Sequence, residues 1–344
     1  MVYPPKPAPG DRVAVLSPSA GLPAIFPHPY ELGLTRLRDE LGLTPVEYPT
    51  TRVMGASGAA RAADIHAAFA DPTITAVLAS IGGSDQITVL KHLDSDLLRA
   101  HPKPFFGFSD NTNLLNFLFN LGIVGYHGGS VMVHLGRSGR TDPATMDSLR
   151  AALFTHDWFE LTPASRWTDE AYDWKSPEML EIEPPTFDGG GWIWHNARGV
   201  VAGRSWGGCI EIVQWLMQVG RDIRPVEDYA GHVLFLESSE EMPPADEVYY
   251  TLRNMGERGL LQQFSALLVG RPKAWEHSRK NSPEQKKAYA DAQRAAYLRA
   301  LGEYNPDAMI VFDVDFGHTD PQLIIPYGGD IRIDAPNRKI TVRY

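Results

Sequence analysis

Short apolar stretches alternate with amphipathic ones from residue 12 to residue 122. The stretches "VAVL", "TPVEYP" and "ITAVLASIGG" are typical of strands, whereas "PYELGLTRLRDELGL", "SGAARAADIHAAFADP" and "SDQITVLKHLDSDLL" have the spacing of helices. Strands that alternate with helices form βαβ units, and such units build a parallel sheet. The pattern predicts an α/β fold with a doubly wound parallel sheet, whose ligand site lies at the carboxyl ends of the strands. Three loops at such ends are candidates: residues 17–21, 82–85 and 109–112.

The regular alternation of strand-like and helix-like stretches ends at about residue 160. Residues 161–200 are irregular and rich in Trp, Pro, Gly and acidic side chains, and strands and helices then resume up to a closing hairpin, "DIRIDAPNRKITVRY". We therefore predict an N-terminal α/β domain over residues 1–160 and a Trp-rich linker or substrate loop over residues 161–200. A mixed α/β C-terminal domain is predicted over residues 201–344.

Composition excludes several classes of protein. Of the 344 residues, 43% are apolar and 22% charged, as in a soluble globular protein. We find no apolar run of about 18 residues, which argues against a membrane partner, and no signal peptide at the start, so a cytoplasmic location is expected. The single cysteine, Cys209, rules out an internal disulfide framework. The formal charge of −10 without a basic stripe argues against a nucleic-acid polymer as partner, but not against a nucleotide-sized ligand.

A serine stands where one of the predicted strands meets a helix, in "KPFFGFSDNTNLLNFLFNLG". Ser109 can be read as a helix N-cap, because Ser, Asp, Asn and Thr all favour that position. It can also be read as a nucleophile on a tight strand-to-helix turn, where the helix N-terminus offers free N–H groups to an oxyanion. The usual Gly-x-Ser-x-Gly pattern lacks its second glycine here, since Asn111 takes that place. The residues alone leave both interpretations open.

A serine nucleophile needs a base, and the base needs a group that orients it. Among the 11 histidines, His318 follows the apolar strand "AMIVF" in "DFGHTDP", and Glu237 closes the apolar strand "HVLFLE". A carboxylate at the end of a buried strand requires a partner. The alternatives are an ordinary loop histidine and a glutamate that begins the acidic loop "ESSEE". Gly82 and Gly83 allow a backbone N–H to approach a ligand, or form an ordinary turn.

Other reaction classes fit the residues less well. Asp313, Asp315 and His318 could hold a metal, but the spacing is poor and no H-E-x-x-H motif is present, so no metal is predicted. An α/β-hydrolase esterase has the same order of serine, acid and histidine but would carry the full Gly-x-Ser-x-Gly. A periplasmic-type binding protein would share the layout but would need an export signal.

Four segments together resemble the signatures of the LD-carboxypeptidase family of serine peptidases: "SIGG", "GFSDNT", "LFLE" and "DFGHTDPQLIIPYG". The segment "GRSWGGCIEIVQWL" also resembles that family's glycine-rich segment. The resemblance implies a flavodoxin-like N-terminal domain, a smaller C-terminal α/β domain, a homodimer, and no metal or organic cofactor. It implies that Ser109 is the nucleophile, His318 the base and Glu237 the acidic member of a triad. The backbone N–H groups of Gly83 and Asp110 would form the oxyanion hole.

The family has at least two branches, and this chain resembles the one related to the microcin C7 immunity protein. Members of that branch cleave the amide between an amino acid or peptide and a nucleotide-like sulfamoyl or phosphoramidate group, which would give a role in antibiotic resistance. The resemblance rests on "SIGGSDQ" and on "RWTDEAYDWKSP", in which Trp167 and Trp174 would stack on a nucleobase. Other tryptophans, such as Trp206 and Trp215, would be core or interface residues.

The alternative branch removes the terminal D-alanine from murein tetrapeptides, so the substrate is expected to be a small peptide or a peptidyl-nucleotide. Gly82 is expected to approach the substrate through its backbone. Arg271, in "LLVGRPKAW", is a candidate anion binder, although it can equally be a structural arginine.

Overall fold

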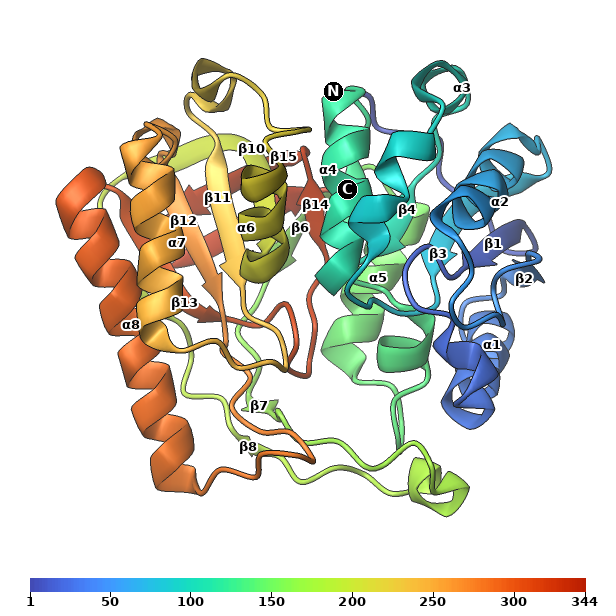
Figure 1. Cartoon of the computed structure of the whole chain (residues 1–344). Coiled ribbons are helices and arrows are strands. Elements are labelled where there is room, and N and C mark those ends of the chain that lie inside the picture. Colours follow the sequence, from blue (N-terminus) through green and yellow to red (C-terminus); the bar gives the residue numbers. More distant parts are fainter.

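The computed structural model describes residues 1–344. It contains two β-sheets side by side, each accompanied by helices (Figure 1). The first sheet has six strands, in the spatial order β14 (Ile325–Tyr327), β5 (Gly125–His127), β4 (Phe105–Gly107), β3 (Ile74–Ala79), β1 (Arg12–Leu16) and β2 (Thr44–Glu47). Strands β1 to β5 are parallel and follow the order 2-1-3-4-5 of flavodoxin-like folds. The predicted doubly wound fold is therefore confirmed.

The helices of this half are α1 (Pro27–Asp39), α2 (Gly58–Ala70), α3 (Ser95–Ala100), α4 (Thr112–Asn120) and α5 (Pro143–Phe154). Of these, α1, α2 and α4 were predicted, whereas α5 was not. One prediction was wrong, because residues 84–98 do not form a single helix. Two short 3-10 turns precede α3, and α3 begins separately because the Asp94 side chain accepts hydrogen bonds from the N–H groups of Asp96 and Leu97. Apolar spacing cannot reveal such a break, because the turns bury the same face.

The second sheet has eight strands, in the order β6 (Trp158–Leu161), β16 (Lys339–Arg343), β15 (Asp330–Asp334), β10 (Val200–Cys209), β11 (Val233–Glu237), β12 (Ala266–Gly270), β13 (Met309–Val314) and β9 (Ile193–His195). Strands β10 to β13 are parallel. Its helices are α6 (Ile210–Val219), α7 (Ala245–Glu257) and α8 (Pro283–Tyr304). A separate two-stranded ribbon, β7 (Arg166–Trp167) with β8 (Phe187–Asp188), lies below both sheets in Figure 1. This sheet has more strands than the first because it includes β6 and β9, which precede residue 200 in the chain.

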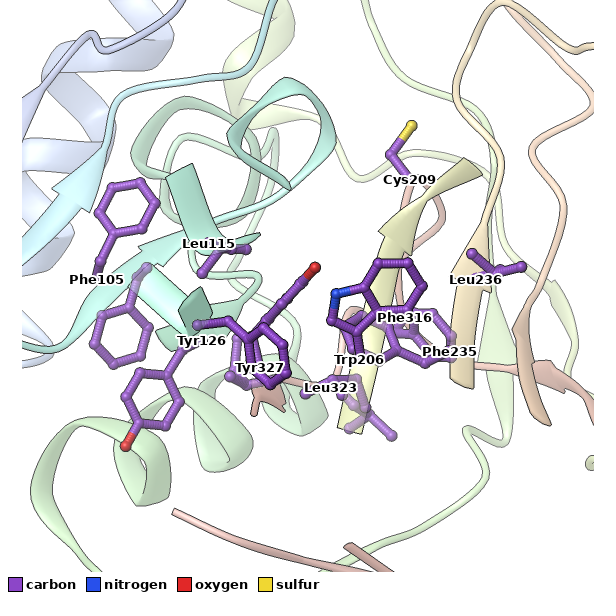
Figure 2. Packing of buried hydrophobic residues seen from close by; sticks show 14 of the residues in the cluster. Phe105, Leu115, Tyr126, Trp206, Cys209, Phe235, Leu236, Phe316, Leu323 and Tyr327 are labelled. Carbon is purple, nitrogen blue, oxygen red and sulfur yellow. The ribbon is translucent and has the colours of Figure 1, made fainter. Parts of the chain in front are cut away.

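The two halves of the chain exchange strands. β14 comes from the C-terminal half but pairs antiparallel with β5, and β6 pairs with the C-terminal strand β16. Figure 2 shows Tyr327 of β14 between Tyr126 of β5 and Trp206 of β10. Trp206 and Tyr327 are fully buried, and the indole N–H of Trp206 donates to Asn116 of α4 at 3.0 Å. One apolar core thus connects the two sheets.

No helix of this structure combines the length and the apolar character that crossing a bilayer requires.

Candidate active site

Ser109 lies at the corner between β4 and α4 in a strained backbone conformation. Its φ is 59°, in the left-handed region that side chains other than glycine rarely adopt. Strain of this kind costs about 1–3 kcal/mol and is concentrated at functional sites. Ser109 opens a single 3-10 turn, and its side chain caps neither this turn nor α4. The geometry is that of a nucleophile elbow and not that of an N-cap.

Glycines let the backbone approach this corner closely. A Cβ at Gly107 would lie 2.9 Å from the Cβ of Asn111, so the turn requires glycine there. A Cβ at Gly82 would lie 3.1 Å from the Oγ of Ser109 and 3.5 Å from the backbone nitrogen of Asp110. The Gly82–Gly83 backbone and the start of the Ser109 turn therefore border one small space. This proximity is compatible with the predicted oxyanion hole of Gly83 and Asp110, which stays a prediction.

The Asp110 side chain stabilises this turn through hydrogen bonds. It is fully buried and accepts hydrogen bonds from the Ser19 hydroxyl, from the Gln86 N–H at 2.9 Å and from the Asn113 amide at 2.8 Å. Burial raises the pKa of this carboxyl above its ordinary value. The three candidate loops thus meet through Ser19, Gln86 and Asp110. Sequence reasoning selected the loops but missed Ser19 and Gln86, which carry no motif of their own.

His318 and Glu237 form a close pair at the ends of β13 and β11. Nδ1 of His318 lies 2.5 Å from Oε2 of Glu237, whose side chain is fully buried. Gly317 has a φ of 98°, and a Cβ there would lie 2.7 Å from Oε2 of Glu237, so only glycine permits the approach. The other carboxylate oxygen, Oε1, lies 3.6 Å from Nε2 of His127 on β5.

The charges around His318 set its protonation. Burial lowers its pKa, but the carboxylates of Glu237 and Glu240 outweigh burial and raise the pKa to about 9. Burial lowers the pKa values of His127 and His134 to about 3, so both rings are neutral at pH 7. His318 is therefore the imidazole of this region that carries charge at neutral pH.

A cavity of about 430 Å³ brings most of the predicted residues together. Ser109, His318, Gly82, Gly83 and Trp174 all line it. Ser109 comes from the first sheet and His318 from the second, so the cavity lies between the two domains. Glu237 lies behind His318, where it can orient the ring without occupying the cavity.

Two predicted substrate-binding residues lie elsewhere. Trp167 and Arg271 line a second cavity of about 380 Å³, beside α8. The Arg271 guanidinium lies 4.7 Å from the centre of the Trp167 ring and 3.3 Å from a carboxylate oxygen of Asp315. The family resemblance predicted that Trp167 and Trp174 would both stack on the nucleobase of one ligand. The structure separates them, because Trp167 belongs to the β7–β8 ribbon, whereas Trp174 packs edge-on against Phe26 of the first domain.

The residues weighed as metal ligands also point to different partners. Asp313 pairs with Arg294 at 2.8 Å, and Asp315 accepts from the Trp192 indole at 2.9 Å, while His318 faces Glu237. These donors do not converge on one point, so the arrangement does not favour a bound metal.

A serine on a strand-to-helix corner, across a cavity from a histidine–carboxylate pair, is the arrangement found in serine hydrolases. Comparison with known families agrees with this class. The model of the LD-carboxypeptidase N-terminal domain matches residues 13–128, and that of the LD-carboxypeptidase C-terminal domain matches residues 202–333. The chain belongs to the LD-carboxypeptidase family.

Individual relatives extend over nearly the whole chain. A putative carboxypeptidase of Treponema pallidum is 28% identical over 340 residues, which cover 97% of this chain and 92% of the relative. The microcin C7 self-immunity protein of Escherichia coli is 23% identical over 291 residues, covering 82% and 77%. The crystal structure of a protein from Streptococcus pneumoniae that resembles this immunity protein, in complex with AMP, superposes with a TM-score of 0.82 at 26% identity, covering 97% and 99%.

Proposed function

We propose that this protein is a serine amide hydrolase that cleaves the bond between an aminoacyl or peptidyl group and a nucleotide-like sulfamoyl or phosphoramidate group. One observation carries the proposal. A strained serine and a histidine–carboxylate pair, from different domains, line the same cavity. Strain at Ser109 and a carboxylate buried behind His318 both cost stability, and backbone strain of this kind is concentrated at functional sites, which supports the proposal.

The proposed mechanism gives each residue a role. Neutral His318 accepts the proton of Ser109 as the hydroxyl attacks the amide carbonyl. Glu237 accepts a hydrogen bond from Nδ1–H and so keeps Nε2 free to act as the base. The N–H groups of Gly83 and Asp110 stabilise the oxyanion, a contribution worth about 10²–10³ in turnover per donor. His318 then protonates the leaving nitrogen, and water releases the acyl group from Ser109.

The nucleotide part of the proposal rests on Trp174 and on the similarities. Trp174 lines the Ser109 cavity, and its aromatic face can stack on a base. The structure from S. pneumoniae was determined with AMP, and the chain is similar to the microcin C7 self-immunity protein. The competing substrate is a murein tetrapeptide, which carries no base.

A direct assay decides between these substrates. Purified protein is incubated with an aminoacyl-sulfamoyl adenosine and, separately, with a tetrapeptide ending in D-alanine, and the released products are quantified. We expect faster cleavage of the nucleotidyl compound, labelling of Ser109 by a fluorophosphonate probe, and no loss of activity with a chelator. Faster release of D-alanine would instead assign the murein reaction, and chelator-sensitive activity without labelling would contradict the serine mechanism.

The pH dependence of kcat/KM should report the raised pKa of His318. Only the neutral imidazole accepts the Ser109 proton, so activity should increase as pH rises through about 9 and not through the ordinary value of about 6.5. Log kcat/KM should therefore still climb with a slope of about one between pH 7 and pH 8. A plateau already reached at pH 7 would show that the carboxylates do not hold the proton on His318.

Replacing Trp174 by alanine should weaken the nucleotidyl substrate specifically. Loss of base stacking should cost about 1–3 kcal/mol, mostly in KM, because stacking acts equally on the ground and transition states. Trp158→Ala is a matched control, since Trp158 is exposed on β6 and lines neither cavity. Trp167→Ala tests whether the second cavity contributes to binding. Equal losses for the nucleotidyl substrate and the tetrapeptide in Trp174→Ala would show that Trp174 only supports packing.

A further inference from the structure

Glu240 has a position that neither the motifs nor the proposed mechanism explains. It lies in the loop after β11, its side chain is 49% exposed, and it lines the Ser109 cavity. Its Oε2 lies 3.2 Å from Nε2 of His318, and it forms no other ion pair and no hydrogen bond within the chain. The carboxylate therefore has the catalytic imidazole as its sole charged partner.

The contact of Glu240 with Nε2 of His318 conflicts with the proposed role of Nε2 as the base. The nitrogen must accept the Ser109 proton, but a proton held between Nε2 and Glu240 blocks that step. With Glu237 on Nδ1 and Glu240 on Nε2, the resting ring is an imidazolium between two carboxylates. Catalysis requires Glu240 to leave Nε2, and a half-exposed side chain on a loop can do so.

A released Glu240 carboxylate finds no free cation in the cavity wall. Lys273 is the one lysine or arginine that lines the cavity, and it is 9% exposed. Its Nζ already donates to the carbonyl of Asp169 at 2.9 Å and lies 3.9 Å from Glu276. A cation on the ligand, close to the reacting atoms, is the partner that this cavity wall leaves open for Glu240.

We propose that Glu240 binds an ammonium group on the acyl side of the scissile bond, namely the free α-amine of an aminoacyl substrate. The α-carbon that carries this amine is bonded directly to the carbonyl carbon that Ser109 attacks, so the ammonium necessarily lies near Nε2. The leaving side of a sulfamoyl or phosphoramidate substrate offers no cation. Binding of the amine draws Glu240 away, so the imidazolium loses one stabilising carboxylate and releases its Nε2 proton to solvent, which leaves neutral His318 as the base. The same contact thus selects the substrate and activates the enzyme. This inference rests on the proposed function and narrows its substrates to those with a free amine.

The test compares an aminoacyl-sulfamoyl adenosine with its Nα-acetyl counterpart, using wild type, Glu240→Gln and Glu241→Gln. Glu241→Gln is the matched control because it removes the same charge from the next residue. The side chain of Glu241 is exposed and lies outside the cavity. We expect wild type and Glu241→Gln to prefer the free amine by at least about tenfold in kcat/KM. Glu240→Gln should lose that preference through a higher KM for the free amine, while the acetylated compound, which cannot displace Glu240 in wild type, should be cleaved faster at neutral pH.

A second readout separates this role from a structural one. The charged and titratable groups that face His318 are Glu237 on β11, Glu240 on the following loop, Glu211 on α6, and His127 and His134 from the first domain. Removing only the Glu240 carboxylate should shift the rise of kcat/KM on the acetylated substrate to lower pH, whereas Glu241→Gln should leave it in place.

The outcomes that overturn the inference are distinct. Equal cleavage of the two compounds by wild type, or an equal rise in KM for both in Glu240→Gln, refutes the role of Glu240 and leaves the proposed function intact. A third compound, an Nα-acetyl-lysyl-sulfamoyl adenosine, carries its ammonium on the side chain and not on the α-carbon. If the enzyme prefers this compound to the one with the free α-amine, the inference is also refuted. If wild type cleaves neither compound, the proposed function fails and the inference fails with it.

Discussion

Ser109→Ala should reduce amide hydrolysis at least about 10³-fold while the protein stays folded. In the proposed mechanism the hydroxyl is the group that attacks, and the positive φ at this corner does not depend on it, because alanine has the same Cβ as serine. The alanine side chain also fits against Gly82 without a new contact. Turnover, circular dichroism and elution volume would be measured together, and the elution volume would also test the homodimer that the family resemblance implies.

Ser165→Ala is the control for this substitution, because Ser165 is exposed on the loop before β7 and should retain full activity. The Ser109→Ala protein should also fail to react with a fluorophosphonate. Turnover within a fewfold of wild type would remove Ser109 from the chemistry and return it to a merely structural place in the turn.

Glu237→Gln should lower turnover by about 10⁴, the scale of such a change in another serine-hydrolase triad. The carboxylate accepts from Nδ1–H at 2.5 Å, so the neutral ring that acts in catalysis has its free lone pair on Nε2. A glutamine can turn its amide N–H toward Nδ1, which moves the ring proton to Nε2 and removes the base. The loss should appear in kcat, because Glu237 lies behind His318 and does not line the main cavity.

Two measurements distinguish this effect from unfolding. Glu241→Gln, on an exposed side chain nearby, should behave as wild type, and the melting temperature of Glu237→Gln should show whether the buried site tolerates the amide. Glu237→Gln should also remove the charge that most raises the pKa of His318, so residual activity should rise with pH below 9. A folded Glu237→Gln protein with normal kcat would contradict the assigned role.

The sequence alone determined the fold class and selected the candidate site residues. Alternation of periods 2 and 3.6 is a local property of the chain, so the parallel sheet and most of its helices could be predicted. Parallel strands present their carboxyl ends at one edge, so Ser109, Gly82 and the loop at residues 17–21 could be expected to meet. Glu237 and His318 could be selected because polar residues at the ends of apolar strands require partners.

Tertiary structure decided what depends on contacts between distant segments. The exchange of β14 and β6 between the sheets, the strained φ of Ser109 and the separation of Trp167 from Trp174 have no local signature. Glu240 lies in an acidic loop that looks solvated in the sequence, and only the pairing of β11, β12 and β13 in one parallel sheet brings the loops after β11 and β13 together and places its carboxylate at Nε2 of His318. Apolar periodicity specifies which face of an element is buried, whereas the partner of that face, and the charge that a side chain meets there, are set by packing across the whole molecule.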